Sequence, residues 1–182
     1  MKKLTLLGDS IRLIGYGTKV PELLKDEFTV YQPDDNCRFA KYTLRGVLYE
    51  WANEIENSDI IHWNNGLWDV CDLGDGAFSS KEEYVDNMVR IAKLLKKKAK
   101  TVIFATTTPV RNDHPHNSNE LIIEYNNAVC PLLSDMGIVI NDLHSLVYPD
   151  IDKYIREDDK IHLTDEGIEL CADKVAENVR KV

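Results

Sequence analysis

Positive charge is scarce in this sequence. The 182 residues include 31 Asp and Glu but only 22 Lys and Arg, which gives a formal net charge of −9 at pH 7. Proteins that bind nucleic acid or an anionic membrane through phosphate groups need an excess of cations. The one basic run, residues 93–100, falls at the end of an expected helix, where cations complement the helix dipole. We therefore expect neither nucleic acid nor a membrane as partner.

Paired cysteines are also missing. The four cysteines are far apart and form no C-x-x-C pair, and no histidine cluster has the spacing of zinc ligands. A chain of this length buries a sufficient core without disulfide bonds. We therefore expect reduced thiols, no metal and no other cofactor.

Long apolar runs are absent. No stretch approaches the length of roughly 20 residues that a transmembrane helix needs. The apolar run at residues 4–7 is too short for the core of a secretory signal peptide. We expect a cytoplasmic protein with a single domain over residues 1–182, and the sequence does not indicate its oligomeric state.

The common phosphate-binding and nucleophile motifs are absent too. The sequence contains no G-x-x-x-x-G-K loop and no G-x-S-x-G elbow. Residues 15–17 (G-Y-G) resemble part of a dinucleotide-binding loop, but they are displaced from the preceding strand and lack the third glycine. We therefore reject a nucleotide-binding interpretation.

What the sequence does contain is a regular alternation of short apolar strands and amphipathic helices. Strands are expected at residues 4–7, 28–31, 59–63, 101–106 and 138–140. Helices are expected at residues 20–24, 42–53 and 120–134, after a capping box at residues 80–83, and after a cap at Thr164. This order predicts an α/β fold, with a parallel sheet covered by helices on both faces.

A serine follows the first expected strand. Gly8–Ser10 (G-D-S) breaks the apolar run and leaves a hydroxyl at the carboxyl end of a strand, where ligands bind in parallel sheets. A serine hydroxyl becomes a good nucleophile when a histidine takes its proton and a carboxylate orients that histidine. Ser10 is therefore a candidate nucleophile, with a polar turn or helix cap as the alternative.

The partners that such a serine needs occur elsewhere in the chain. Asp159 and His162 lie three residues apart just before the last helix, where a local hydrogen bond at a helix entrance is the alternative role. Asp158 is a second candidate for orienting the histidine. Asn64, at the end of the third strand, is a candidate donor to a developing oxyanion or a simple turn residue beside Gly66.

Together these residues resemble the SGNH (GDSL-type) hydrolases, a family of esterases, lipases and carbohydrate deacetylases. Residues 8–10 match the nucleophile block, residues 159–164 (D-K-I-H-L-T) match the closing D-x-x-H block, and Asn64 matches the asparagine block. The resemblance spans the whole chain. It implies a flavodoxin-like, three-layer α/β/α fold with five parallel strands.

Two positions depart from the family pattern. The family places a glycine after the second strand, with its backbone N–H facing the oxyanion, and counting from Asn36 puts Lys41 there. A backbone N–H survives a change of side chain, and Gly46 is the other candidate. His62 stands where the family often has a glycine, which makes Asn65 an alternative to Asn64, although the spacing favours Asn64.

The resemblance implies a serine esterase that needs no cofactor. Ser10 would attack the ester, His162 would take its proton, and Asp159 would orient His162. The backbone N–H groups of Ser10 and Lys41 and the Asn64 amide would hold the oxyanion. We expect a small-molecule ester, with a small acyl group such as acetyl on a sugar. Thioesters and lysophospholipids are also compatible, and the rival interpretation is a non-catalytic flavodoxin-like module that binds a small ligand.

Two further groups of residues are open in role. His114 and His116 have a spacing seen in metal sites, but no third ligand is evident, so a solvated or substrate-contacting loop is the preferred interpretation. The three tryptophans, Trp51, Trp63 and Trp68, suit either a platform for a sugar or acyl group, or packing in the core and at its rim.

Overall fold

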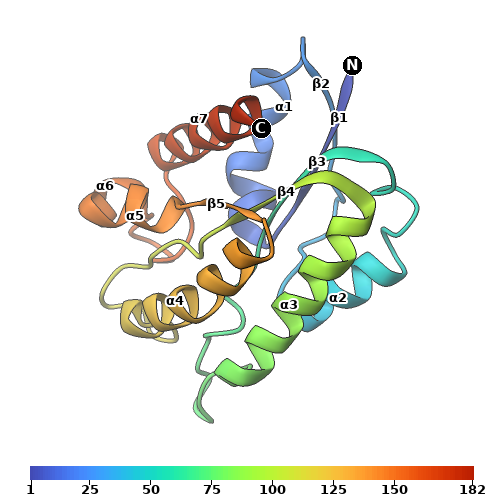
Figure 1. Cartoon of the computed structure of the whole chain (residues 1–182). Coiled ribbons are helices and arrows are strands. Elements are labelled where there is room, and N and C mark those ends of the chain that lie inside the picture. The colour runs from blue at the N-terminus through green and yellow to red at the C-terminus, as the bar shows by residue number, and fades with distance from the viewer.

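Five short strands form one parallel sheet in the computed structural model, which describes residues 1–182 (Figure 1). The strands are β1 (Lys2–Leu7), β2 (Phe28–Tyr31), β3 (Ser58–Asn64), β4 (Ala99–Ala105) and β5 (Val139–Asn141). Their order is β2-β1-β3-β4-β5, with Leu4 of β1 opposite Val30 on one side and Ile60 on the other. From β1, the chain adds β2 on one side of the sheet and then β3, β4 and β5 on the other, so the direction of strand addition changes between β1 and β3. In parallel sheets, ligands bind at the carboxyl ends of the strands at such a switch point.

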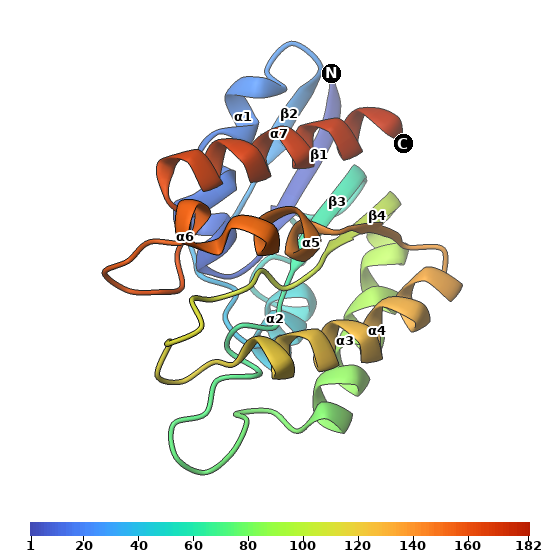
Figure 2. The same ribbon diagram turned by 90° about the vertical axis from the view of Figure 1, so that its left-hand side faces the viewer.

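Helices cover both faces of the sheet, as Figures 1 and 2 show. One group of helices in mutual contact comprises α2 (Ala40–Leu48), α3 (Lys81–Lys98) and α4 (Asn119–Asp135). The other comprises α1 (Val20–Leu23), α5 (Leu143–Val147), α6 (Ile151–Tyr154) and α7 (Asp165–Lys181), with 3₁₀ turns at Tyr16–Thr18 and Tyr148–Asp150. The predicted three-layer α/β/α fold is therefore confirmed. The hydroxyls of Ser80 and Thr164 cap α3 and α7, as the sequence predicts.

The helix expected at residues 42–53 is shorter than the sequence suggests. It begins at Ala40 and ends at Leu48, because the chain turns back so that the N–H of Trp51 donates to the carbonyl oxygen of Gly46 (2.8 Å). A Cβ atom on Gly46 would overlap the Trp51 ring. Gly46 is thus a packing position inside α2.

The segment after Ser10 forms an irregular helix. Residues Ile11–Gly15 make a π-helix, and π-helical turns are frequent at functional sites. The Arg12 side chain is completely buried in it. Its guanidinium donates to the carbonyl oxygens of Gly8 (3.2 Å), Pro33 (2.8 Å) and Asp35 (2.5 Å). Arg12 therefore fastens the loop after β2 to the turn after β1.

The core lies between the sheet and its two helical layers. Two of the three tryptophans belong to it: Trp63 packs on Phe104 with ring centroids 4.9 Å apart, and Trp51 is buried over α2. Trp68 is 43% exposed, in the loop after β3. None of the helices combines the length and the apolar character needed to cross a membrane.

Candidate active site

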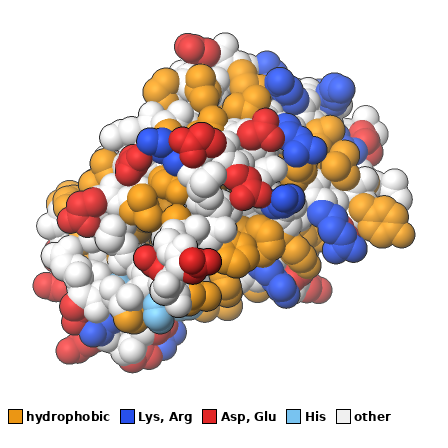
Figure 3. All heavy atoms as spheres, turned by 90° about the horizontal axis from the view of Figure 1, so that it is seen from below, with side chains coloured by type: hydrophobic (Ala, Val, Ile, Leu, Met, Phe, Trp, Pro, Cys, Tyr) orange, Lys and Arg blue, Asp and Glu red, His pale blue; other side chains and the backbone are white.

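Three side chains from opposite ends of the chain meet at the carboxyl edge of the sheet. The Oγ atom of Ser10 lies 2.8 Å from Nε2 of His162, and Nδ1 of His162 lies 3.0 Å from Oδ2 of Asp159. All three side chains are partly buried. The strands run downward in Figure 1, so Figure 3 looks onto this edge, where charged side chains of both signs lie among apolar ones. The structure thus brings together the three residues that the sequence singles out.

The loop before α7 presents Asp159 and His162 through its own backbone. Oδ1 of Asp159 accepts hydrogen bonds from the N–H groups of Ile161 (3.1 Å) and His162 (2.9 Å). Burial alone would raise the pKa of Asp159, but these bonds and the one from the His162 ring outweigh it and lower the pKa to about 2. The alternative carboxylate, Asp158, pairs with Arg156 instead.

The same loop is anchored from the side by Arg111, which the sequence analysis did not single out. The Arg111 guanidinium bonds to the Asp152 side chain (2.8 Å) and to the carbonyl oxygens of Ile155 and Arg156 (3.0 Å each). The Arg111 N–H donates to the carbonyl oxygen of Lys160 (2.9 Å). The loop after β4 therefore supports the segment that carries Asp159 and His162. No local sequence pattern signals this, because all these contacts are distant along the chain.

Asn64 lies at the end of β3, buried beneath the serine turn. Its Oδ1 accepts from the Tyr16 hydroxyl (2.7 Å), and its Nδ2 donates to Oδ1 of Asp9 (2.8 Å). These opposite partners fix the orientation of the amide and leave the second N–H of Nδ2 free of any partner within the chain. A Cβ atom on Gly8 would overlap the Asn64 amide, so the glycine of the G-D-S turn gives Asn64 its space.

The neighbouring candidates point elsewhere. The Nδ2 of Asn65 donates to the carbonyl oxygen of Arg38 (2.8 Å), in the loop after β2. His62 is buried and pairs with Asn141 (3.1 Å), and burial lowers its pKa to about 3, so its ring is neutral. Among the alternatives of the sequence analysis, Asn64 is thus the amide held beside the G-D-S turn.

Lys41 lies in the first turn of α2. Its side chain is exposed and its Nζ reaches Glu83 (3.1 Å). Backbone N–H groups in a first helical turn have no acceptor within the helix, so the Lys41 N–H is available to an external acceptor. The N–H of Gly46, by contrast, belongs to the interior of α2.

A buried carboxylate that the sequence analysis did not single out holds the start of α2. Both oxygens of Asp69 accept from the N–H of Ala40 (3.0 and 3.1 Å), and Oδ1 also accepts from the Ser79 hydroxyl (2.8 Å). Asp69 is fully buried, which raises its pKa to about 7. Asn65 makes a second link, to the carbonyl oxygen of Arg38, a residue with a φ of +49°. Asp69 and Asn65 together connect the loop after β3 to the residues preceding Lys41.

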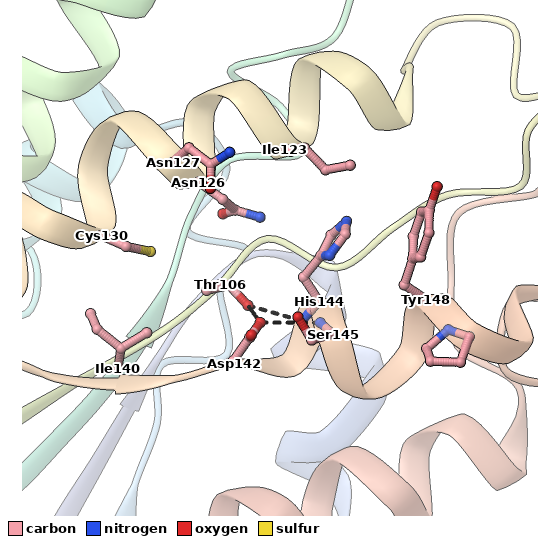
Figure 4. A pocket seen from close by; sticks show the side chains of 11 residues that line it. Thr106, Ile123, Asn126, Asn127, Cys130, Ile140, Asp142, His144, Ser145 and Tyr148 are labelled. Carbon is pink, nitrogen blue, oxygen red and sulfur yellow. Dashed lines mark hydrogen bonds between the residues drawn. The ribbon is translucent and has the colours of Figure 1, made fainter.

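An open cleft of about 440 Å³ borders Ser10 and His162. Its apolar wall comes from Ile11, Ile14, Leu163 and Ile168, and Arg156 contributes a cation at its rim. A separate cavity of about 570 Å³ lies between α4 and α5, where His144 stacks on Tyr148 with ring centroids 5.0 Å apart (Figure 4). That cavity includes none of the candidate catalytic residues.

The all-parallel sheet of five strands with helices on both faces is that of the SGNH (GDSL-type) hydrolase fold, and solved structures agree. An acetyl xylan esterase, AlAXEase, matches with a TM-score of 0.79 and 22% identity over 97% of this chain and 99% of its own. A lipase/acylhydrolase from Enterococcus faecalis matches at 0.79 and 20% identity, over 100% and 96%. A member of the lipolytic G-D-S-L family from Veillonella parvula DSM 2008 matches at 0.79 and 16%, over 100% of both chains.

The chain therefore has the SGNH hydrolase fold. No protein-family model and no curated protein sequence matches it. At identities of 16–22%, a shared architecture does not establish a shared activity.

Proposed function

We propose that the protein is a serine esterase. The observation that carries the proposal is the continuous hydrogen-bonded line from Ser10 Oγ through the His162 ring to Asp159. An ionised Asp159 accepts the N–H of Nδ1, which leaves the lone pair of Nε2 directed at the serine hydroxyl. This is the arrangement that converts a weakly nucleophilic hydroxyl into a reactive one.

In the first half of the reaction, Ser10 Oγ bonds to the carbonyl carbon of the ester while its proton passes to Nε2 of His162. The carbonyl oxygen becomes an oxyanion. The N–H groups of Ser10 and Lys41 and the free N–H of Asn64 stabilise it as donors. The tetrahedral intermediate then collapses, the alcohol leaves with the proton from His162, and Ser10 carries the acyl group.

In the second half, water replaces the alcohol. The water oxygen bonds to the acyl carbon while His162 takes a proton from the water. The same donors stabilise the second oxyanion. Collapse breaks the bond to Ser10 Oγ, which recovers its proton from His162. The products are a carboxylic acid and an alcohol, and the balance requires water alone.

The favoured substrate is a small acyl ester, such as an acetyl group on a sugar. Two of the matched structures support this, since one is an acetyl xylan esterase and another is a lipase/acylhydrolase. The cleft at Ser10 has a volume of about 440 Å³ and four apolar side chains in its lining, which provides room for a small acyl group. Thioesters and lysophospholipids are the alternatives.

The test is hydrolysis of 4-nitrophenyl esters of increasing chain length. We expect activity to be highest on acetate, to fall by several orders of magnitude in Ser10→Ala and His162→Ala, and Ser10 to be labelled by a fluorophosphonate. An optimum on long acyl chains would overturn the substrate preference. Absence of ester hydrolysis would instead favour a non-catalytic ligand-binding module. Variants as active as the wild type would refute the roles proposed for Ser10 and His162.

A further inference from the structure

A second cleft, of about 530 Å³, opens between the loop after β3 and the loop after β4. We name it the histidine cleft, because His114 and His116 line it together with Asp72, Leu73 and Leu121. Two hydrogen bonds join its walls: Asp72 N–H donates to the His116 carbonyl oxygen (2.7 Å), and Asn117 Nδ2 donates to that of Leu67 (2.7 Å). The cleft is therefore a built feature of the fold.

The His114 ring is held in one tautomer. Its Nδ1 accepts hydrogen bonds from the backbone N–H groups of His116 (3.2 Å) and Asn117 (2.9 Å), so the ring proton must sit on Nε2. Protonating Nδ1 would break both bonds. Burial, with the nearby His116, also lowers the pKa of His114. His114 thus offers a fixed N–H donor, at an atom with no partner in the chain.

The His116 ring carries the complementary group. Its Nδ1 lies 3.0 Å from the carbonyl oxygen of Asp72, which can only accept, so Nδ1 holds the proton in the neutral ring. The remaining nitrogen, Nε2, then has a free lone pair. The two rings lie 6.2 Å apart between centroids and are nearly perpendicular. The lining of the cleft therefore includes one ring with a free donor and one with a free acceptor.

This pair matches the hydroxyl groups of a neutral carbohydrate, since each hydroxyl both donates and accepts. The lining contains no Lys or Arg, which disfavours an anionic ligand. Apolar walls from Val70, Leu73 and Leu121 suit the C–H face of a sugar ring.

The histidine cleft lies next to the segment that carries Asp159 and His162. The N–H of His114 bonds to the carbonyl oxygen of Arg111 (2.9 Å), and the N–H of Arg111 bonds to that of Lys160 (2.9 Å). Lys160 Nζ also pairs with Asp113 (2.7 Å). Neither Ser10 nor His162 lines this cleft, so a ligand in it is a neighbour of the reacting group and not the reacting group itself.

We propose that His114 and His116 form a subsite for a sugar unit next to the acylated one, so that the preferred substrate is an acylated oligosaccharide. This inference rests on the proposed esterase function. The two histidines act in binding and specificity, with the reacting atoms left to the site at Ser10.

The test compares acetylated xylobiose with 4-nitrophenyl acetate, which has no second sugar. His114→Asn keeps an acceptor at the position of Nδ1 and removes the Nε2 donor. His116→Asn keeps a donor to Asp72 and removes the acceptor. Losing one neutral hydrogen bond corresponds to a factor of about five. The quantity to compare is kcat/KM on acetylated xylobiose divided by kcat/KM on 4-nitrophenyl acetate. We expect each single variant to lower this ratio about fivefold, mainly through a higher KM for acetylated xylobiose. The double variant should lower the ratio by more than tenfold.

The matched control is His144→Asn, which alters a half-buried histidine in the cavity between α4 and α5. It should leave the ratio unchanged. A ratio unchanged in the His114 and His116 variants, or a matching fall on both esters, would overturn the subsite.

Failure of the esterase proposal would be seen separately, as a wild-type protein that hydrolyses neither ester. In that event the cleft is tested by titrating Ser10→Ala with xylobiose and following the ring nitrogen signals by NMR. Shifts at His114 and His116, but not at His144, would support the subsite. No shift up to the solubility limit of the sugar would refute it.

Discussion

The buried carboxylate of Asp69 makes the stability of this protein depend on pH in a defined direction. Burial raises its pKa from 3.8 to about 7 in the folded chain. The folded protein therefore holds a proton that the unfolded chain releases between these values. The stabilisation that this proton provides is complete below pH 3.8 and is lost as the pH rises through about 7.

Asparagine at this position removes the titration while keeping the shape. Each pKa unit between the two states corresponds to about 1.36 kcal/mol, so the rise of the Asp69 pKa from 3.8 to about 7 is worth about 4 kcal/mol. In Asp69→Asn this pH-dependent loss is absent. The free energy of unfolding of the variant, minus that of the wild type, should therefore rise by about 4 kcal/mol between pH 4 and pH 8.

Urea unfolding at several pH values measures this difference directly. Asp26→Asn is the matched control, since Asp26 is exposed and bonds to no other side chain. A rise of similar size in this control would show that the effect does not come from the burial of Asp69. The informative quantity is the change with pH of the difference in unfolding free energy between Asp69→Asn and the wild type. Contacts that the asparagine gains or loses shift this difference by the same amount at every pH. Parallel stability curves for the wild type and Asp69→Asn would show that Asp69 does not hold a proton in the folded state.

Four other substitutions test the site. Asn64→Ala should lower kcat by roughly 10²–10³ with KM little changed, the effect of losing one oxyanion donor; an unchanged kcat would remove Asn64 from the proposed hole. Tyr16→Phe leaves a buried amide oxygen without its donor, so urea unfolding should show a loss of about 1–3 kcal/mol with a smaller fall in kcat than Asn64→Ala gives. Asp159→Asn favours the wrong tautomer of the catalytic imidazole and should lower kcat by roughly 10³–10⁴ without unfolding the chain; full activity would refute the triad. Gly66→Ala should cost more than about 1 kcal/mol in urea, because φ there is +145° and a Cβ would overlap Thr107; wild-type stability would contradict this strain.

The sequence predicts the sheet because its signals are local. Apolar runs such as residues 4–7 and 101–106 are bounded by turn residues, and the hydroxyls of Ser80 and Thr164 mark where helices begin. The parallel pairing of the strands and the meeting of Ser10 with His162 then follow from the rules of parallel sheets and from the family resemblance. The structure agrees with both.

Other features of the site depend on contacts that no local pattern records. Asp69 resembles any other acid in a polar loop until the fold buries it against the N–H of Ala40. Arg111 is one of many surface cations until it meets three groups more than 40 residues further along the chain. The length of α2 is missed for the same kind of reason, since helical periodicity continues to Trp51 while Trp51 itself packs back on Gly46.

The lysine at position 41 is the clearest departure from the pattern of the SGNH hydrolases, and the proposed oxyanion hole does not need a glycine there. In the proposed hole the donor is a backbone N–H in the first turn of α2, and the Lys41 side chain points away to Glu83. What fixes such a donor is the backbone before it. Here Asp69 holds the N–H of Ala40, and Asn65 holds the carbonyl oxygen of Arg38. The position of this N–H therefore depends on buried acceptors and donors from the loop after β3, and the conformational freedom of glycine is not required at residue 41.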